Sequence, residues 1–173
     1  TKGIVIDWKK WYPMDQALMS YGYGISVSLF QMIHAYTIFT NNGCLLPVTF
    51  NKLGASDKIP CEQVISPETA ATMRSILATT TEEGTGKNAR VEDYSVAGKT
   101  GTAQILDGAH YSNSKHIGSF VGFAPAINPR IIVAVMIDQP TVGMYYGAQT
   151  AAPVFAKIVQ PTLHLLGVKP DKQ

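Results

Sequence analysis

Four consecutive residues, Lys99-Thr100-Gly101-Thr102, place reactive and binding groups inside a predicted strand. A glycine in mid-strand loses side-chain packing and is tolerated where a second backbone must come close. The lysine and two threonines beside it offer one cation and two hydroxyl donors. Such a strand edge suits an extended ligand that ends in a carboxylate, because backbone groups pair with the ligand while side chains hold its charge. The residues alone leave a second interpretation open, an exposed strand with ordinary polar side chains.

Histidines and paired carboxylates are the other candidates for chemistry. The chain has four histidines, His34, His110, His116 and His164. Their spacing suits no metal, and no Asp or Glu stands in register for a catalytic triad. Glu82 and Glu83 are adjacent, and adjacent helical residues do not face each other. We therefore expect ordinary polar histidines, a solvated helix end, no metal site and no cofactor.

Three strands are predicted around the Lys-Thr-Gly-Thr segment, over residues 94–106, 116–126 and 130–138. Asp107-Gly108 breaks the chain after the first, and Asn128-Pro129 makes a tight turn after the second. Such short connections favour an antiparallel sheet with the second strand in the middle. The third strand is apolar at every position of 131–137, so it must be covered on both faces.

Three helical segments can supply this cover. Residues 25–41 carry a rough apolar stripe, formed by Val27, Phe30, Ile33, Ala35 and Ile38. A second helix starts at a Ser66 cap with Pro67 and Glu68 in its first turn, buries Met73, Ile76 and Leu77, and ends by residues 84–86. The last runs over 149–166, where Pro161 should kink it and Val154, Phe155, Ile158, Val159 and Leu163 share a face. Residues 1–24 look irregular, and 45–50 look like a short strand.

Composition limits the class of protein. The 173 residues are 46% hydrophobic and 15% charged, which describes one packed α+β domain. The net charge is +2 and the basic residues are scattered, so we set nucleic acid aside as a partner. The apolar run 131–137 is too short to cross a bilayer. For Cys44 and Cys61 we expect two free, partly buried thiols, with a disulfide as the alternative.

The Lys-Thr-Gly triplet is part of the signature of penicillin-binding proteins and class A β-lactamases. Other segments agree with it in order and spacing: residues 11–15 (Trp-Tyr-Pro-Met-Asp), 20–28 (Ser-Tyr-Gly-Tyr-Gly-Ile-Ser-Val-Ser), 84–86 (Gly-Thr-Gly), 120–126 (Phe-Val-Gly-Phe-Ala-Pro-Ala), 145–147 (Tyr-Tyr-Gly) and 152–155 (Ala-Pro-Val-Phe). Over essentially its whole length the chain resembles class B penicillin-binding proteins, most closely the division-specific peptidoglycan D,D-transpeptidases of the FtsI type.

This resemblance implies roles for seven residues. In the family, Lys99 helps to set the electrostatics of a serine–lysine centre and attracts the substrate carboxylate, and the hydroxyls of Thr100 and Thr102 donate to that carboxylate. Gly101 lets the substrate approach, and the N–H of Thr102 is one of two oxyanion donors. Tyr145 and Tyr146 form a wall against the substrate or β-lactam side chain, and Gly147 is a further substrate-binding residue. Ala148 stands where many relatives have a second glycine.

The implied reaction is acyl transfer on peptidoglycan stem peptides, and β-lactam antibiotics imitate their D-alanyl-D-alanine end. The family's Ser-x-x-Lys and Ser-x-Asn motifs precede Lys-Thr-Gly, yet residues 1–98 contain neither. Ser112 and Lys115 have the Ser-x-x-Lys spacing, but they lie in what we predict to be a loop after Lys-Thr-Gly. Thr40-Asn41-Asn42 resembles Ser-x-Asn only loosely. We therefore expect residues 1–173 to be the C-terminal part of one transpeptidase domain that lacks its nucleophile. A non-catalytic binding module and a β-lactam sensor fragment are the alternatives.

The resemblance also implies a fold and partners. The family fold, shared with serine β-lactamases, is a five-stranded antiparallel sheet flanked by helices, and this chain would supply its last three strands. We expect the free edge of the third strand to be covered by another chain or by the missing N-terminal half. The intact protein would have an inner-membrane anchor and a periplasmic catalytic domain, and would work with a septal glycosyltransferase and other division proteins.

Overall fold

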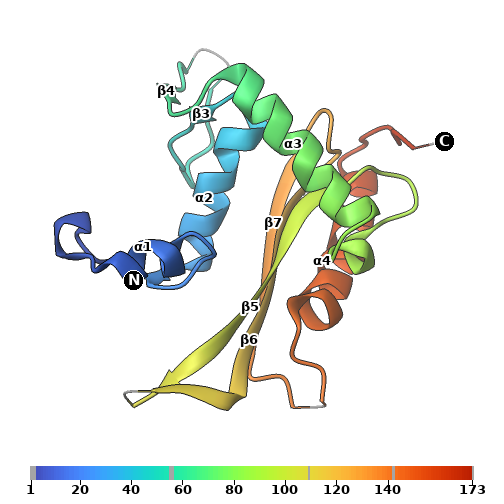
Figure 1. The fold of residues 1–173 in the computed structure, drawn as a ribbon. Helices are drawn as coiled ribbons and strands as arrows, with labels where there is room; N and C mark the ends of the chain where they lie inside the picture. Colours follow the sequence, from blue (N-terminus) through green and yellow to red (C-terminus); the bar gives the residue numbers. More distant parts are fainter. Residues whose placement is uncertain (1–2, 55–56, 109, 142, 173) are drawn as a thin grey trace.

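A three-stranded antiparallel sheet forms the centre of the chain (Figure 1). The computed structural model describes residues 3–54, 57–108, 110–141 and 143–172. The strands are β5 (Ala97–Asp107), β6 (His110–Ala124) and β7 (Ile131–Asp138), in the order β5-β6-β7. Both pairs are antiparallel, which confirms the predicted meander with the second strand in the middle. What covers the outer edge of β7 remains a prediction.

Two strand boundaries differ from those predicted. β5 begins at Ala97, because Tyr94 is fully buried and its hydroxyl donates to the carbonyl oxygen of Val168 at 2.7 Å. β6 begins at His110, so residues 112–115 lie in a strand, where we expected a loop. A register shift between Gln104 and Leu106 lets the two strands stay paired to the end of the hairpin.

Helix α4 (Gly147–Leu165) covers one face of the sheet. Phe155, Val159 and Leu163, four residues apart, are fully buried and join Phe120 in the larger core. Val154 and Ile158 were expected on the same face, but they are partly exposed. The buried stripe of α4 includes Ala151 and Ala152, so Val154 and Ile158 lie at its side. Pro153 and Pro161 both lie inside the helix.

Helices α2 (Leu29–Thr40) and α3 (Pro67–Glu82) lie on the other side. Ser66 caps α3 as predicted, accepting from the N–H of Thr69 at 3.1 Å. The buried residues of α3 are Ala70, Leu77 and Thr81, whereas Ile76 is exposed and Met73 only partly buried. The hydroxyls of Thr80 and Thr81 donate to the carbonyls of Gly98 and Val96, and this contact turns the helix so that Ile76 faces outward.

The predicted stripe on α2 is only partly correct. The helix starts at Leu29 behind a Ser28 cap, so Val27 lies outside it, and Phe30 and Ala35 are exposed. Tyr36 and Phe39 instead pack on the smaller core with Ile132 of β7. Because Val133 and Ile137 pack on the α4 side, β7 is covered on both faces as expected, except at Met136.

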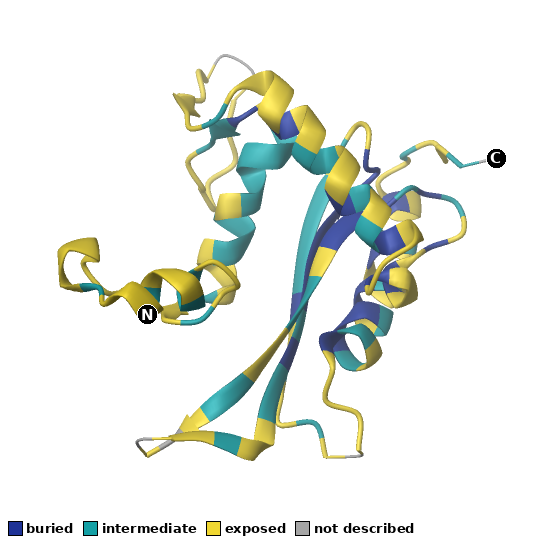
Figure 2. Cartoon of the chain, in the orientation of Figure 1, coloured by how far each residue is buried: buried dark blue, intermediate teal, exposed yellow. Residues whose placement is uncertain are grey.

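Residues 3–28 form an arm with more structure than predicted. β1 (Ile4–Val5) pairs with β2 (Ile25–Ser26), and η1 (Trp8–Lys10) and α1 (Pro13–Met19) lie between them. Figure 2 shows the arm and the hairpin end largely exposed, while the buried residues gather where the sheet meets α4. Among the residues described, no helix is long and apolar enough to cross a membrane.

Cys44 and Cys61 form a disulfide, so the expectation of free thiols is wrong. The predicted strand over 45–50 shrinks to β3 (Cys44–Leu45), which pairs with β4 (Glu62–Gln63). This pairing sets Cys44 opposite Gln63 and brings the two cysteine Cα atoms to 5.3 Å, within the range that a disulfide needs. The cysteines are 17 residues apart, and only the β3–β4 pairing makes them neighbours.

Candidate functional site

The outer edge of β5 is the candidate binding edge. In an antiparallel pair, alternate residues point both backbone groups toward the partner strand or both away from it. The carbonyl of Gly98 is turned away from β6, because it accepts from Thr80 of α3. Thr100 and Thr102 follow at alternate positions, so their N–H and C=O groups also point away from β6. At both threonines the edge therefore offers an extended ligand backbone groups that β6 does not use.

Side chains converge on this edge from both faces of the sheet. Thr100 and Thr102 lie on the α4 face, and Lys99 lies on the opposite face because side chains alternate along a strand. The Lys99 side chain bends around to the strand edge, where Nζ donates to the carbonyl oxygen of Thr100 at 3.1 Å. The hydroxyl of Thr100 lies 2.9 Å from that of Thr85, in the loop after α3. One cation and the hydroxyls of Thr85 and Thr100 thus meet within a few ångströms.

These residues line a depression of about 490 Å³. Lys99, Thr100 and Thr102 form its β5 side. Thr85 and Tyr146 come from the loops after α3 and before α4, and the other lining residues are Ala148 and Gln149. Within the described part of the chain the depression combines a strand edge, one ammonium group and an aromatic ring.

Helix α4 reaches the sheet so closely only because its first residue is a glycine. A Cβ on Gly147 would overlap the carbonyl oxygens of Gly101 and Ser119, which belong to adjacent strands. The N–H of Gly147 donates to the hydroxyl of Thr102 at 3.1 Å. A Cβ on Gly101 would point to the opposite face of the sheet, where it would meet Oγ of Ser119 at 2.5 Å. The N-terminus of α4 is thus seated against the middle of the candidate binding edge.

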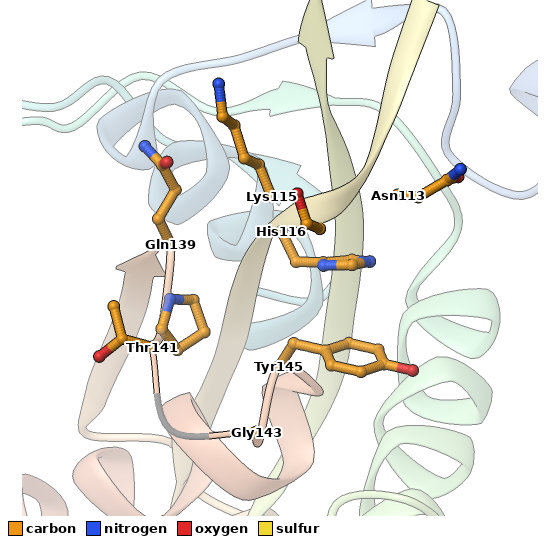
Figure 3. A pocket seen from close by; sticks show the side chains of 9 residues that line it. Asn113, Lys115, His116, Gln139, Thr141, Gly143 and Tyr145 are labelled. Carbon is orange, nitrogen blue, oxygen red and sulfur yellow. The ribbon is translucent and has the colours of Figure 1, made fainter.

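Tyr145 and Tyr146 stand at the entrance to α4 with their ring centroids 4.4 Å apart. The hydroxyl of Tyr145 donates to that of Tyr146 at 3.1 Å, and this contact with Tyr146 raises the pKa of Tyr145 above its ordinary value. Only Tyr146 lines the depression beside β5. Tyr145 lines a neighbouring hollow of about 460 Å³, where its ring stacks on His116 at 4.3 Å, with Gln139 on the far side (Figure 3).

Comparison with known proteins decides the family. The model of the penicillin binding protein transpeptidase domain matches residues 1–160. The chain belongs to this family. The transpeptidase-domain structure of penicillin-binding protein 3 from Burkholderia pseudomallei is 45% identical, with a TM-score of 0.93 over 99% of this chain and 52% of that one. The fold is therefore the mixed helix and antiparallel-sheet fold of the penicillin-binding transpeptidases.

Two curated relatives show how much of such a protein the chain represents. A probable peptidoglycan D,D-transpeptidase PenA from Neisseria flavescens is 45% identical over 99% of this chain and 43% of its own length. The peptidoglycan D,D-transpeptidase FtsI of Buchnera aphidicola (subspecies Baizongia pistaciae) is 32% identical over 94% of this chain and 29% of its own length. The chain thus spans less than half of these two proteins.

Seen against this family, the structure brings most of the predicted site residues together. Lys99, Thr100 and Thr102 share the depression with Tyr146, and Gly147 allows α4 to approach the backbone of Gly101 beneath it. Tyr145 was expected on the same wall as Tyr146, but it lines the neighbouring hollow with His116. Thr85 and Gln149 also line the depression, and no individual role was predicted for either. The Gly-Thr-Gly triplet at 84–86 is the signal that would have identified Thr85.

The Ser112–Lys115 pattern has a structural explanation. Oγ of Ser112 accepts from the N–H groups of Ser114 and Lys115, at 3.3 and 3.1 Å, within the hairpin arm of β6. A nucleophilic serine of this family needs its lysine one helical turn on, and a strand does not provide that arrangement.

The histidines do not gather at the β5 edge. Nε2 of His34 lies 2.8 Å from the carbonyl oxygen of Leu46, and His116 stacks on Tyr145. His164 contacts a carboxylate that we had not foreseen, with Nε2 2.8 Å from Oδ2 of Asp93. His164 lines another hollow, and Asp93 lies in the loop before β5. Neither residue lines the depression at Thr102. No group of three potential metal ligands occurs among the described residues.

Proposed function

We propose that this chain is the substrate-strand part of a serine-type peptidoglycan D,D-transpeptidase that also binds β-lactams. The observation that carries the proposal is the open outer edge of β5, where Lys99, Thr100 and Thr102 line one depression with Tyr146. The family match and the relatives named D,D-transpeptidase support it.

Each residue has a part in binding the D-alanyl-D-alanine end of a stem peptide. Lys99 and the hydroxyls of Thr100 and Thr102 hold the terminal carboxylate by charge and hydrogen bonds. The C=O of Thr102 accepts from the amide of the penultimate residue, and its N–H donates to the oxygen of the scissile carbonyl. Tyr146 forms a wall, and Gly147 keeps α4 close enough to the strand to define the depression.

The reaction is acyl transfer in two steps. A serine oxygen attacks the penultimate D-alanine carbonyl, the carbon–nitrogen bond breaks, and the terminal D-alanine leaves with a proton on its nitrogen. The amine of a neighbouring stem peptide then attacks the ester, forms a new amide and releases the serine. We place the attacking serine outside residues 1–173, since Ser112 lies on the β6 arm.

The same relatives support a finer proposal. Because an FtsI protein is among them, we propose that the intact protein acts in septal wall synthesis with a glycosyltransferase and other division proteins. Its catalytic domain would lie in the periplasm, held by an inner-membrane anchor outside this chain, and its N-terminal half would complete the sheet beside β7.

Labelling with a fluorescent penicillin tests the proposal. The full-length protein should form a stable covalent adduct, and a peptide ending in D-alanyl-D-alanine should compete for it. Mass spectrometry should locate the label on a serine outside residues 1–173, and the isolated chain should remain unlabelled. A label on Ser112 would refute this placement of the nucleophile. Binding without any covalent adduct would instead support the non-catalytic module.

A further inference from the structure

Three tyrosines from two distant segments meet at the hairpin end of β5 and β6. The rings of Tyr23 and Tyr111 touch edge to face with centroids 5.5 Å apart, and Tyr21 lies 5.7 Å from Tyr23 in the same manner. Tyr21 is 63% exposed and Tyr111 is 49% exposed, so two of the three rings retain free surface. We call these three residues the tyrosine cluster.

Two glycines and the hairpin register position these rings. Gly22 and Gly24 have φ of +99° and +75°, values that side chains disfavour, and they flank Tyr23. Tyr111 stands opposite Leu106 in the β5–β6 register, and Leu106 is itself 61% exposed. The hairpin projects beyond the helices at this end (Figure 1). The cluster therefore lies at the hairpin end, with Tyr111 on β6 paired with Leu106 near the end of β5, the strand whose outer edge we assign to substrate.

The direction of a bound peptide follows from the groups that would hold it. If Lys99 and Thr100 hold the terminal carboxylate, the rest of the peptide must run the other way along β5, past Thr102 toward Leu106. Four residues separate Thr102 from Leu106, which in an extended strand is about 13 Å. A stem of about five residues, with its penultimate residue at Thr102, has roughly three left, or about 10 Å, before its amino end. That end consequently arrives at the hairpin end of β5, one strand away from Tyr111 of β6.

We infer that the tyrosine cluster binds the amino sugar to which the stem peptide is attached, an inference that rests on the proposed function. A stem peptide is joined at its amino end to a sugar of the glycan strand, so a sugar ring is the group that reaches this place. Exposed tyrosines suit it, because their ring faces pack on the C–H face of a sugar while their hydroxyls form hydrogen bonds. The site would let the enzyme distinguish a glycan-linked stem from a free peptide.

A purely structural role for the cluster makes a different prediction. If Tyr111 only ties the arm to the hairpin, its loss would disturb β5 and slow every reaction at Thr102. If the cluster binds sugar, its loss matters only for substrates that carry one. The two roles are therefore separated by comparing substrates with and without the sugar.

The experiment uses the full-length protein and two synthetic substrates, a muramyl-linked stem peptide and the same peptide with an acetylated amino end. The ratio of their kcat/KM values measures the contribution of the sugar, and acylation by penicillin is measured in parallel. The wild type should prefer the muramyl substrate. Tyr111→Ala should lower that ratio by between about twofold and tenfold, the size of one aromatic contact, with little change toward penicillin or the acetylated peptide.

Matched variants complete the test. Tyr111→Phe keeps the ring and should retain most of the preference, and Tyr12→Ala, an exposed tyrosine elsewhere on the arm, should leave the ratio unchanged. A wild-type ratio near one, or a ratio that Tyr111→Ala does not move, would overturn the inference while leaving the transpeptidase proposal intact. Equal loss toward all three substrates would show a structural role. A wild type that penicillin does not acylate would remove the proposed function and this inference with it.

Discussion

The hydroxyl of Thr102 accepts a hydrogen bond from the backbone N–H of Gly147 at 3.1 Å. This bond joins the middle of the candidate binding strand to the first residue of α4. A hydroxyl can accept one hydrogen bond and still donate its own proton. Thr102 can therefore be held by the helix and hold a ligand carboxylate at the same time.

Thr102→Val separates these two tasks in the full-length protein. Losing a hydrogen bond to a charged group should slow acylation by penicillin about tenfold or more, because such bonds contribute about 1.5–3 kcal/mol. The N–H of Gly147 also loses its acceptor, so the melting temperature should fall, but by less than the loss of rate would imply. Thr102→Ser keeps the hydroxyl and should keep most of the rate. Parallel losses of rate and stability in Thr102→Val would mean that Thr102 is a structural residue.

Gly147→Ala tests the close approach of α4. The new Cβ would overlap the carbonyl oxygens of Gly101 and Ser119, so the helix must move away from the sheet. We expect a loss of about 1–3 kcal/mol in the free energy of unfolding, the usual cost of overpacking, together with slower acylation. Chemical denaturation measures the first effect. Lys157→Ala, at an exposed position of the same helix away from the depression, is the matched control and should be nearly neutral.

The Cys44–Cys61 disulfide should stabilise the chain by restricting its unfolded state. For cysteines 17 residues apart the loop-entropy estimate is about 3 kcal/mol. Denaturation with and without a reductant should reveal this difference, and Cys44→Ala combined with Cys61→Ala should lower stability similarly while abolishing the response to reductant. Alkylation of both cysteines in the unfolded, unreduced protein would show that they are free.

Tyr36 makes stability depend on alkaline pH. Burial raises the pKa of Tyr36 to about 12, from an ordinary value of 10.0. The folded chain keeps this proton when the unfolded chain has lost it, so the stabilisation is complete below pH 10 and is lost as the pH rises toward 12. The free energy of unfolding should fall by up to about 2–3 kcal/mol across this window. Tyr36→Phe should flatten the fall, and an unchanged slope would show that Tyr36 titrates normally.

Much of the fold could be predicted because its signals are local. Ser66 and Pro67 mark the start of α3 within a few residues of sequence, and short connections at Asp107-Gly108 and after Ala124 require antiparallel neighbours. Lys99 and Thr102 could be assigned to a strand edge because alternation and a mid-strand glycine are properties of the strand itself.

Predictions failed where a distant partner decides the outcome. Ile76 looks as apolar as Leu77, but the hydrogen bonds of Thr80 and Thr81 to β5 determine which of them faces inward. The start of β5 depends on Tyr94 reaching Val168, far along the chain. No pattern near either residue contains that information.

The sequence by itself determined the order of the elements, the strand that carries Lys99 and Thr102, and the family, because these depend on residue types and on spacing along the chain. The tertiary structure alone decided the contact of Gly147 with Gly101, the pairing of Cys44 with Cys61, and the meeting of Tyr23 with Tyr111. Each joins residues that are far apart in sequence. Their approach is set by how helices and strands pack, which local preferences do not specify.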